Sequence, residues 1–462
     1  METFINVISK YLFIVLMFFY TWESFSALRH KRPEDKAGIF QRQNAAIFLT
    51  YLLGIFLVYM NQTDTSELNV IILGGVQLCY LIIVLGVFPI IYPNINKAIL
   101  SNMCMLLTIG FIVLARLGME RSIMQFMIVS VMTIFSLMVP FFMSRFEWWK
   151  NLTWVYCFVG IGLLVAVIIL GSMINGARLY IIISGVRIQP SEFVKIIFVF
   201  FVAAVLGETA NLKQVFVSAI FAGIYVIILV FSTDLGSALI FFTMYLFMVY
   251  VASRKSIYLF LGGGGMAVAS YVAYHLFPHI QVRVQAWQNP LAEETVNGSS
   301  HQVAQSLFAL GSGGLSGTGL YQGFPKKVPL VENDFIFSAI GEEFGAIFAG
   351  LLILVCLSCF IEFLATGMEQ ESTFNRLVCV GLGVGYAIQV ILTVGGAINM
   401  IPSTGVTLPL ISSGRSSIVS ILLVFSIIQG LAIVGSKKKT PKQRKKPMKG
   451  ERYVSTELQE RY

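Results

Sequence analysis

Long apolar runs recur along almost the whole chain and leave it few ways to fold. Each run has about the 20 residues that a helix needs to cross a bilayer. Charged residues make up 12% of the 462 residues, whereas soluble domains carry about 25%. A backbone in hydrocarbon must satisfy its hydrogen bonds internally, and runs of this length do so as helices. The sequence therefore predicts an all-α polytopic membrane protein.

Basic residues beside the runs predict the topology. They follow the first run, 5–28, which is the reverse of a signal peptide, and nine Lys or Arg lie between 437 and 452. Because Lys and Arg stay on the cytoplasmic side, we expect an outer N-terminus and a cytoplasmic, disordered tail at 436–462. Thirteen spans fit these opposite ends: 5–28, 44–60, 68–91, 98–115, 123–143, 152–173, 192–206, 215–231, 236–252, 257–277, 335–365, 378–397 and 416–435.

Cysteine and charge usage excludes several classes of function. All six cysteines fall inside apolar runs, so they indicate neither disulfides nor a metal site, and the CxxC pair Cys356 and Cys359 is expected to pack. The positive charge is concentrated in the 29–42 loop and the tail. That pattern indicates topology and anionic lipid, and it argues against a nucleic-acid partner.

The stretch from His301 to Gly345 holds the first functional candidate. Asp334 stands where an apolar run begins, and a carboxylate there must be hydrogen-bonded, paired or ligated, because leaving it bare in hydrocarbon costs several kcal/mol. The glycines upstream predict either plain turns or backbone that something approaches closely, such as a diphosphate or a sugar. These glycines are at 311, 313, 314, 317 and 319.

A second polar segment, residues 175–195, ends in a predicted helix start at Gln189 to Glu192. Pro190 suits the first helical turn, and Glu192 and Lys195, three residues apart, share a helical face and can pair. A capped helix with an internal ion pair and a functional role are both open. Asp234 is expected to cap the helix at 236–252.

The predicted topology brings separate polar segments to one side of the membrane. Residues 176–195, 234, 283–334 and 399–417 all fall on the outer face. Convergence of four loops predicts a site that works at the outer leaflet.

These residues carry a resemblance to the SEDS family (shape, elongation, division and sporulation), the RodA/FtsW/SpoVE group. The matching segments are Gly176-Ala177-Arg178, QPSE at 189–192 with Lys195, Asp234-Leu235-Gly236, QVRVQAWQNP at 281–290, AQSLFALGSGGLSGTGL at 304–320, the run from Pro329 to Gly345, and GVTLPLISSGRSS at 405–417. The resemblance implies a ten-helix core at 98–435 with an outer loop at 278–334. Residues 1–97 would form a three-helix membrane extension.

The family's activity is the polymerisation of lipid II into glycan strands, usually with a class B penicillin-binding protein as partner. The resemblance thus implies a peptidoglycan glycosyltransferase in a bacterial plasma membrane, with the family's essential carboxylate at Asp334. It places supporting residues at Arg178, Gln189, Glu192, Lys195, Asp234 and Glu343.

Glycosyl transfer needs a base for the attacking hydroxyl and positive charge for the departing diphosphate. Asp334 is the candidate base, or the ligand of a divalent cation (magnesium or manganese), and no organic cofactor is expected. The candidates for substrate binding are Arg283, Lys326, Lys327, Arg415 and Ser416. Lys326 and Lys327 could equally be solvated loop charges.

The sequence departs from the family pattern at Tyr180, Thr233 and Ser413-Gly414-Arg415. These departures leave open whether the chain acts in elongation, division or sporulation. Two other functions stay open as well: a lipid II flippase, and a non-catalytic scaffold for a penicillin-binding protein. A transporter is expected to carry its polar groups near the bilayer midplane, which disfavours the flippase.

Overall fold

A computed structural model describes the backbone of residues 2–30, 33–61, 67–145, 148–174, 177–183, 185–207, 210–292, 296, 298 and 300–443. Within these residues, twelve helices are long and apolar enough to cross a membrane. The one remaining predicted span, 192–206, corresponds to α7 (Pro190–Leu206), an apolar helix of 17 residues. The chain is therefore an all-α polytopic membrane protein, as the apolar runs predict.

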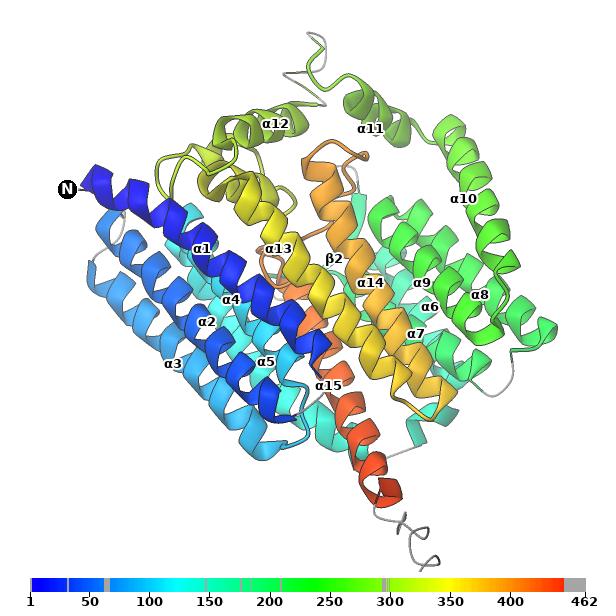
Figure 1. Ribbon diagram of the computed structural model, residues 1–462. Coiled ribbons are helices and arrows are strands. Elements are labelled where there is room, and N and C mark those ends of the chain that lie inside the picture. Colours follow the sequence, from blue (N-terminus) through cyan, green and yellow to red (C-terminus); the bar gives the residue numbers. More distant parts are fainter. Residues whose placement is uncertain are drawn as a thin grey trace, which may run out of the picture.

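The first three helices pack as a layer on one side of the bundle (Figure 1). They are α1 (Glu2–Arg29), α2 (Pro33–Asn61) and α3 (Glu67–Ile91). Helix α1 packs on α2 and on the distant α13, whereas α3 contacts α4 and α5. Helix α2 packs on α4 as well, so all three helices of the extension contact the core.

The remaining long helices form the core around α4 (Lys97–Leu117), which is buried along almost its whole length. The bounds of the others are α5 (Met119–Arg145), α6 (Thr153–Leu170), α8 (Leu212–Phe231), α9 (Leu235–Ser253), α10 (Ile257–Leu276), α13 (Ile336–Met368), α14 (Thr373–Ala397) and α15 (Arg415–Gln443). Helix α15 runs beyond the end expected at 435, and the tail from 444 lies outside the described residues.

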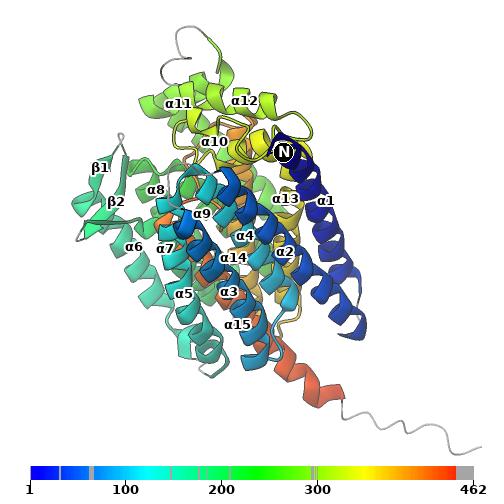
Figure 2. The ribbon, with the colours of Figure 1, turned by 90° about the vertical axis from the view of Figure 1, so that its left-hand side faces the viewer.

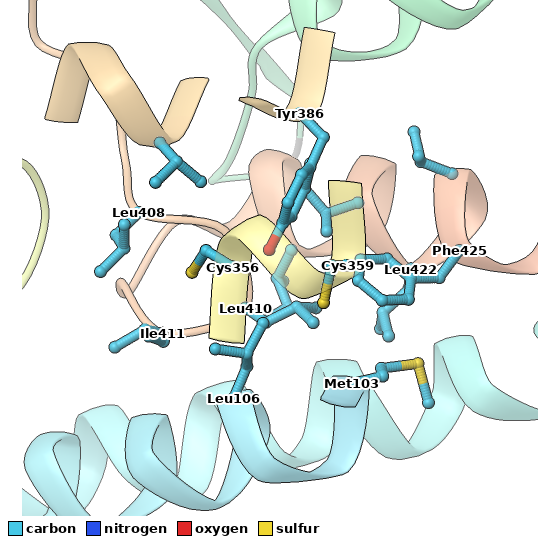
Figure 3. Close-up of a cluster of buried hydrophobic side chains, with 14 of the residues drawn as sticks. Met103, Leu106, Cys356, Cys359, Tyr386, Leu408, Leu410, Ile411, Leu422 and Phe425 are labelled. Atoms are coloured by element: carbon cyan, nitrogen blue, oxygen red, sulfur yellow. The ribbon is translucent and has the colours of Figure 1, made fainter. Parts of the chain in front are cut away.

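The interior between these helices is a continuous apolar cluster, shown in Figure 3 where α4, α13, α14 and α15 meet. Cys356 and Cys359 lie in this cluster as free, buried thiols beside the ring of Tyr386. The expectation that this CxxC pair packs is confirmed.

Short elements gather at one end of the bundle (Figures 1 and 2). The long segment at 278–334 contains two helices, α11 (Pro278–Gln288) and α12 (His301–Gly313), and a 3-10 turn, η2 (Pro325–Lys327). At the same end lies an antiparallel three-stranded sheet of β1 (Ser172–Ile174), β2 (Ala177–Ile183) and β3 (Val186–Ile188). The sequence did not predict this sheet. The N-terminus of α1 is at this end, and α15 leaves from the other (Figure 2).

Helix α13 is broken at Gly345, whose backbone is far from helical at φ 87° and ψ 168°. The break removes the bonds that Ala346 and Ile347 would donate to the carbonyls four residues earlier. Segment 314–319 enters the break and replaces them. Thr318 N and Gly319 N donate to Glu342 O and Glu343 O, and Ala346 N and Ile347 N donate to Gly314 O and Leu315 O.

The glycines of this segment allow two backbones to touch. A Cβ atom at Gly317 would lie 2.3 Å from Glu343 O, and one at Gly313 would lie 2.1 Å from Gly341 O. The close approach expected at these glycines is therefore made by the protein's own helix, and a diphosphate or sugar is not needed to explain it. We call residues 314–319 the inserted loop.

We predict that Gly345→Ala lowers the thermal unfolding midpoint of the detergent-purified protein. The alanine would be strained at positive φ, and its Cβ would lie 2.3 Å from Gly317 N, so the expected cost is about 2–5 kcal/mol. Gly350→Ala is the matched control, because its Cβ meets nothing within 4 Å and alanine favours a helix. Equal midpoints for the two variants would contradict this account of the break.

Candidate functional site

Asp334 lies two residues before the first residue of α13. Its carboxylate is partly buried and accepts no hydrogen bond from a described residue. It faces the segment between α14 and α15, since a Cβ at Gly405 would lie 3.7 Å from its Oδ2. The pKa of Asp334 is raised to about 6, mainly by burial; the nearby Arg283 opposes this rise, and Glu332 adds to it. The site thus holds a carboxylate with unused acceptor capacity.

Residues 398–414, which we call the re-entrant segment, form the wall opposite Asp334. Helix α11 is hydrogen-bonded to this segment on one side. Arg283 Nη1 donates to Ser403 O at 2.8 Å, and Trp287 and Asn399 exchange two hydrogen bonds of 3.1 Å. Arg283 is thereby held close to both Asp334 and Asp234, whose charges raise its pKa although burial lowers it overall.

The re-entrant segment also fixes the backbone that carries Asp334. Ser412 Oγ donates to Asn333 O at 2.6 Å, and Ser413 N donates to Glu332 O at 2.8 Å. The Glu332 carboxylate pairs with Arg121 of α5 at 2.9 Å. These contacts come from two different parts of the chain, so tertiary contacts help to position Asp334.

Asp234 is the N-cap of α9 and links it to the start of α7, which in turn contacts the start of α15. Its Oδ1 accepts from Ser237 N at 3.1 Å, as expected for a cap. Its Oδ2 accepts from Ser191 Oγ of α7 at 2.9 Å. Gln189 N donates to Ser416 Oγ of α15 at 2.9 Å. Burial raises the pKa of Asp234, and the hydrogen bonds from Ser237 and Ser191 oppose that rise.

The expected pair between Glu192 and Lys195 is present and almost buried, with side-chain exposures of 12% and 7%. Each partner has a second contact: Ser420 Oγ donates to Glu192 at 2.7 Å, and Lys195 donates to Gln389 Oε1 at 2.9 Å. Gln389 in turn donates to Thr407 O of the re-entrant segment. The pair therefore joins α7, α14 and α15 beneath the site.

Tyr180 of β2 marks the meeting point of these groups. Its pKa is raised first by burial and then by the negative charges of Asp334, Asp234 and Glu192. The structure therefore brings together parts of the four polar segments that the topology places on one face. The catalytic and binding roles of these residues stay predictions.

Other candidate residues lie apart from this cluster. Lys326 and Lys327 are exposed on η2, with the Lys327 ammonium 4.7 Å from the centre of the Phe324 ring. Arg178 Nη1 donates to Ile168 O at 3.0 Å, so its cation caps the C-terminal end of α6. Arg415 is exposed at the start of α15, next to Ser416.

Glu343 belongs to a different network, around Arg116 of α4. The two form an ion pair of 2.9 Å, buried to 3% and 11% side-chain exposure. Glu343 also accepts from Tyr321 N, and the Arg116 guanidinium lies 4.3 Å from the centre of the Tyr321 ring. Sequence reasoning missed Arg116, Gln389 and Ser191, because their partners are far away in the chain.

The carboxylates of the site do not form a protein-only metal cage. Within the described residues, no group of three or more His, Cys, Asp or Glu is placed to hold a metal ion. Magnesium usually binds one or two carboxylates together with substrate phosphates and keeps several waters. A single free carboxylate at Asp334 fits that mode of binding.

Comparison of the sequence with known proteins identifies relatives over most of the chain. A family model for FtsW, RodA and SpoVE, described as "Cell cycle protein", matches residues 95–436. The chain is 34% identical over 270 residues to "Peptidoglycan glycosyltransferase RodA" of Mycobacterium tuberculosis (strain ATCC 25618 / H37Rv), covering 55% of this chain and 57% of the relative. It is 32% identical over 310 residues to "Stage V sporulation protein E" of Bacillus subtilis (strain 168), covering 62% and 81%.

Solved structures show the same fold. One, described as "Structural coordination of polymerization and crosslinking by a peptidoglycan synthase complex", matches with a TM-score of 0.61 and 22% identity over 74% of this chain and 98% of that chain. The rod shape determining protein RodA of Thermus thermophilus matches with a TM-score of 0.54 and 21% identity, covering 73% and 96%. The family match begins at residue 95, so α1, α2 and α3 lie outside it.

We predict that exchanging the buried pair is tolerated better than breaking it. Glu192→Lys or Lys195→Glu alone places two like charges together, and breaking a buried pair costs about 3–5 kcal/mol. The double exchange restores an opposite pair, and Ser420 and Gln389 can each act as donor or acceptor. Thermal unfolding midpoints of the three purified variants test this. Equal losses in all three would mean that the pair acts through something other than its mutual attraction.

Proposed function

The chain belongs to the cell cycle protein family of FtsW, RodA and SpoVE, and from that premise we propose that it is a peptidoglycan glycosyltransferase that polymerises lipid II. The observation that carries the proposal is Asp334, a partly buried carboxylate with no hydrogen-bond donor among the described residues, held near Arg283 where four polar segments meet. The match spans 57% of the mycobacterial relative. The names of the relatives therefore support the proposed activity but do not by themselves establish it for this chain.

The proposed reaction joins the anomeric carbon of a lipid-diphosphate donor to a sugar 4-hydroxyl of the acceptor. The hydroxyl oxygen forms the new bond, its proton passes to Asp334, and the bond from the anomeric carbon to the diphosphate breaks. A pKa of about 6 suits a general base near neutral pH. The departing diphosphate takes the electron pair and needs positive charge.

Arg283 is the best-placed cation for that role. Its guanidinium is fixed by Ser403 O and lies close enough to Asp334 to affect its pKa, and an Arg fork can contact a phosphate through two donors. Arg415 is exposed beside Ser416, which is bound to the start of α7, and would contact a more peripheral phosphate. Lys326 and Lys327, exposed on η2, would raise the local concentration of an anionic substrate.

Asp334 has an alternative role as the protein ligand of magnesium or manganese. The cation would supply positive charge to the diphosphate oxygens. In that arrangement the Asp334 carboxylate binds the cation, and another group must accept the proton of the attacking hydroxyl. The two roles are therefore distinguishable by titration.

We also propose the membrane orientation and the partner. The basic cluster from 437 to 452 favours a cytoplasmic C-terminus and an outer N-terminus, so the site would face the outer leaflet of a bacterial plasma membrane. A class B penicillin-binding protein is the proposed partner. The solved complex of similar fold, which its authors describe as coordinating polymerization and crosslinking, supports this proposal.

We predict that Asp334→Asn lowers the rate of lipid II polymerisation by about 10² to 10⁴, the usual contribution of a general base. The amide keeps the size of the side chain, so folding and membrane insertion should persist. Glu120→Gln is the matched control, because its carboxylate is exposed at the start of α5, and it should keep most of the activity. The assay uses purified protein, with the proposed partner and lipid II.

Near-normal polymerisation by folded Asp334→Asn would contradict the assignment of the base, and Glu332, Glu342 and Glu343 would be the next carboxylates to test. Normal polymerisation with defective lipid translocation would instead favour the flippase.

We predict that the rate of polymerisation falls as the pH falls through about 6. The pKa of Asp334 is raised to about 6, so the carboxyl is protonated below that value and can neither accept a proton nor bind a cation. The rate at about pH 5 should be roughly tenfold below its plateau. A midpoint well below 6 would favour the metal-ligand role, since a bound cation stabilises the ionised form. A flat profile from about pH 5 to about pH 8 would contradict both roles.

A further inference from the structure

A helix from outside the family core packs against the break in α13. We infer that α1, through Lys10 and Phe13, is a positioning element that keeps the inserted loop in the break and so fixes the half-helix that follows Asp334. This inference deepens the proposed function and rests on it. It gives a specific role to part of the three-helix extension, residues 1–97.

Phe13 contacts both halves of the broken helix. Its side chain is 1% exposed. Its ring lies edge-on to Phe344 at 5.0 Å and to Phe348 at 6.4 Å between centroids. Phe344 precedes Gly345 and Phe348 follows it, so a single ring packs on the two sides of the break. Such aromatic pairs contribute stability beyond the area they bury.

Lys10 contacts the inserted loop itself. Its ammonium donates to Gly317 O at 3.2 Å, and Gly317 N is already bonded to Gly313 O. One helical turn earlier, the Asn6 carbonyl lies beside Gly319, where a Cβ atom would be 3.4 Å away. Helix α1 therefore covers the face of the inserted loop along about one and a half turns.

The same helix is fixed farther down to the second half of α13. Tyr20 Oη and Ser24 Oγ both donate to Asn102 Oδ1 of α4, at 2.9 and 3.0 Å. Ser24 and Asn102 each bond Ser358 of α13. These residues are buried, where hydrogen bonds between helices help to hold a membrane bundle. Helix α1 is thus hydrogen-bonded to the half of α13 that follows Gly345 and packs against the half that precedes it.

The break has an alternative in which these contacts are lost. If the inserted loop leaves, Ala346 and Ile347 can bond Glu342 O and Glu343 O, and α13 becomes continuous. The continuous helix would restore two bonds within α13, but the four backbone groups of the inserted loop that bond α13 would lose these partners. The contacts of Lys10 and Phe13 belong to the inserted state alone and therefore favour it. The orientation of residues 336–344, and hence of Asp334, depends on which state is populated.

The test measures the loop and the activity separately. Phe13→Ala and Lys10→Met remove the two contacts, and Lys10→Arg keeps a donor for Gly317 O. Phe18→Ala is the matched control, because Phe18 is 57% exposed on the outer face of the same helix. Hydrogen–deuterium exchange is followed in peptides covering residues 314–319 and 341–347 of the full-length protein in lipid nanodiscs. Lipid II polymerisation is assayed on the same samples.

We expect exchange in these peptides to be about tenfold faster in Phe13→Ala and Lys10→Met, with a matching fall in polymerisation rate. Lys10→Arg and Phe18→Ala should behave like the parent. Unchanged exchange in both contact variants would overturn the inference whatever the activity. Faster exchange with parental polymerisation would overturn the positioning role. If the parent itself fails to polymerise lipid II, the proposed function fails, and the exchange data still decide whether α1 holds the loop.

Discussion

The backbone of α13 cannot leave hydrogen bonds unmade inside an apolar bundle, and much of this structure follows from how the break at Gly345 meets that requirement. An unpaired backbone group in hydrocarbon costs several kcal/mol. The inserted loop supplies four bonds to the groups that the break exposes. Because the partners are backbone atoms at van der Waals contact, Gly313, Gly317 and Gly345 must lack side chains. The break also separates the first turns of the helix from its membrane-spanning part, and Asp334 stands at the start of those turns.

The polar groups around Asp334 follow a common pattern in which each is bound by partners from other elements. The Asp234 carboxylate accepts from Ser191 and Ser237, and the Glu192 carboxylate accepts from Lys195 and Ser420. These bonds hold the ends of α7, α9 and α15 at fixed positions and limit the electrostatic cost of burying charge. Asp334 differs from both, since no described residue donates to it. A surrounding in which most charged groups are paired, with one carboxylate left to accept a proton, is what preorganised catalysis requires.

The sequence predicted what depends on local spacing and failed where distant segments meet. Span length and hydropathy sufficed for the helices, the three-residue spacing for the Glu192–Lys195 pair, and the position before a helix for the Asp234 cap. The sheet at 172–188 was missed, because its strands are short and lie between two spans. The glycines of the inserted loop signalled close approach, but nothing local shows that the approaching group is α13. Arg116 was not predicted as the partner of Glu343, because the two residues are 227 positions apart.

The attachment of the extension shows how its helices can influence a core they do not belong to. In lipid, apolar faces gain little by leaving the hydrocarbon for one another, so helix pairs are selected by packing and by hydrogen bonds. Two sets of hydrogen bonds of this kind attach the extension to the core. Tyr20 and Ser24 of α1 bond α4 and through it α13, whereas Gln77 of α3, itself bonded to Tyr51 of α2, bonds Ser122 of α5. Helix α5 also packs on α15, whose first turns carry the Ser416 contact to α7. The layer is therefore linked to the polar cluster through other helices, by α13 on one side and by α5 and α15 on the other.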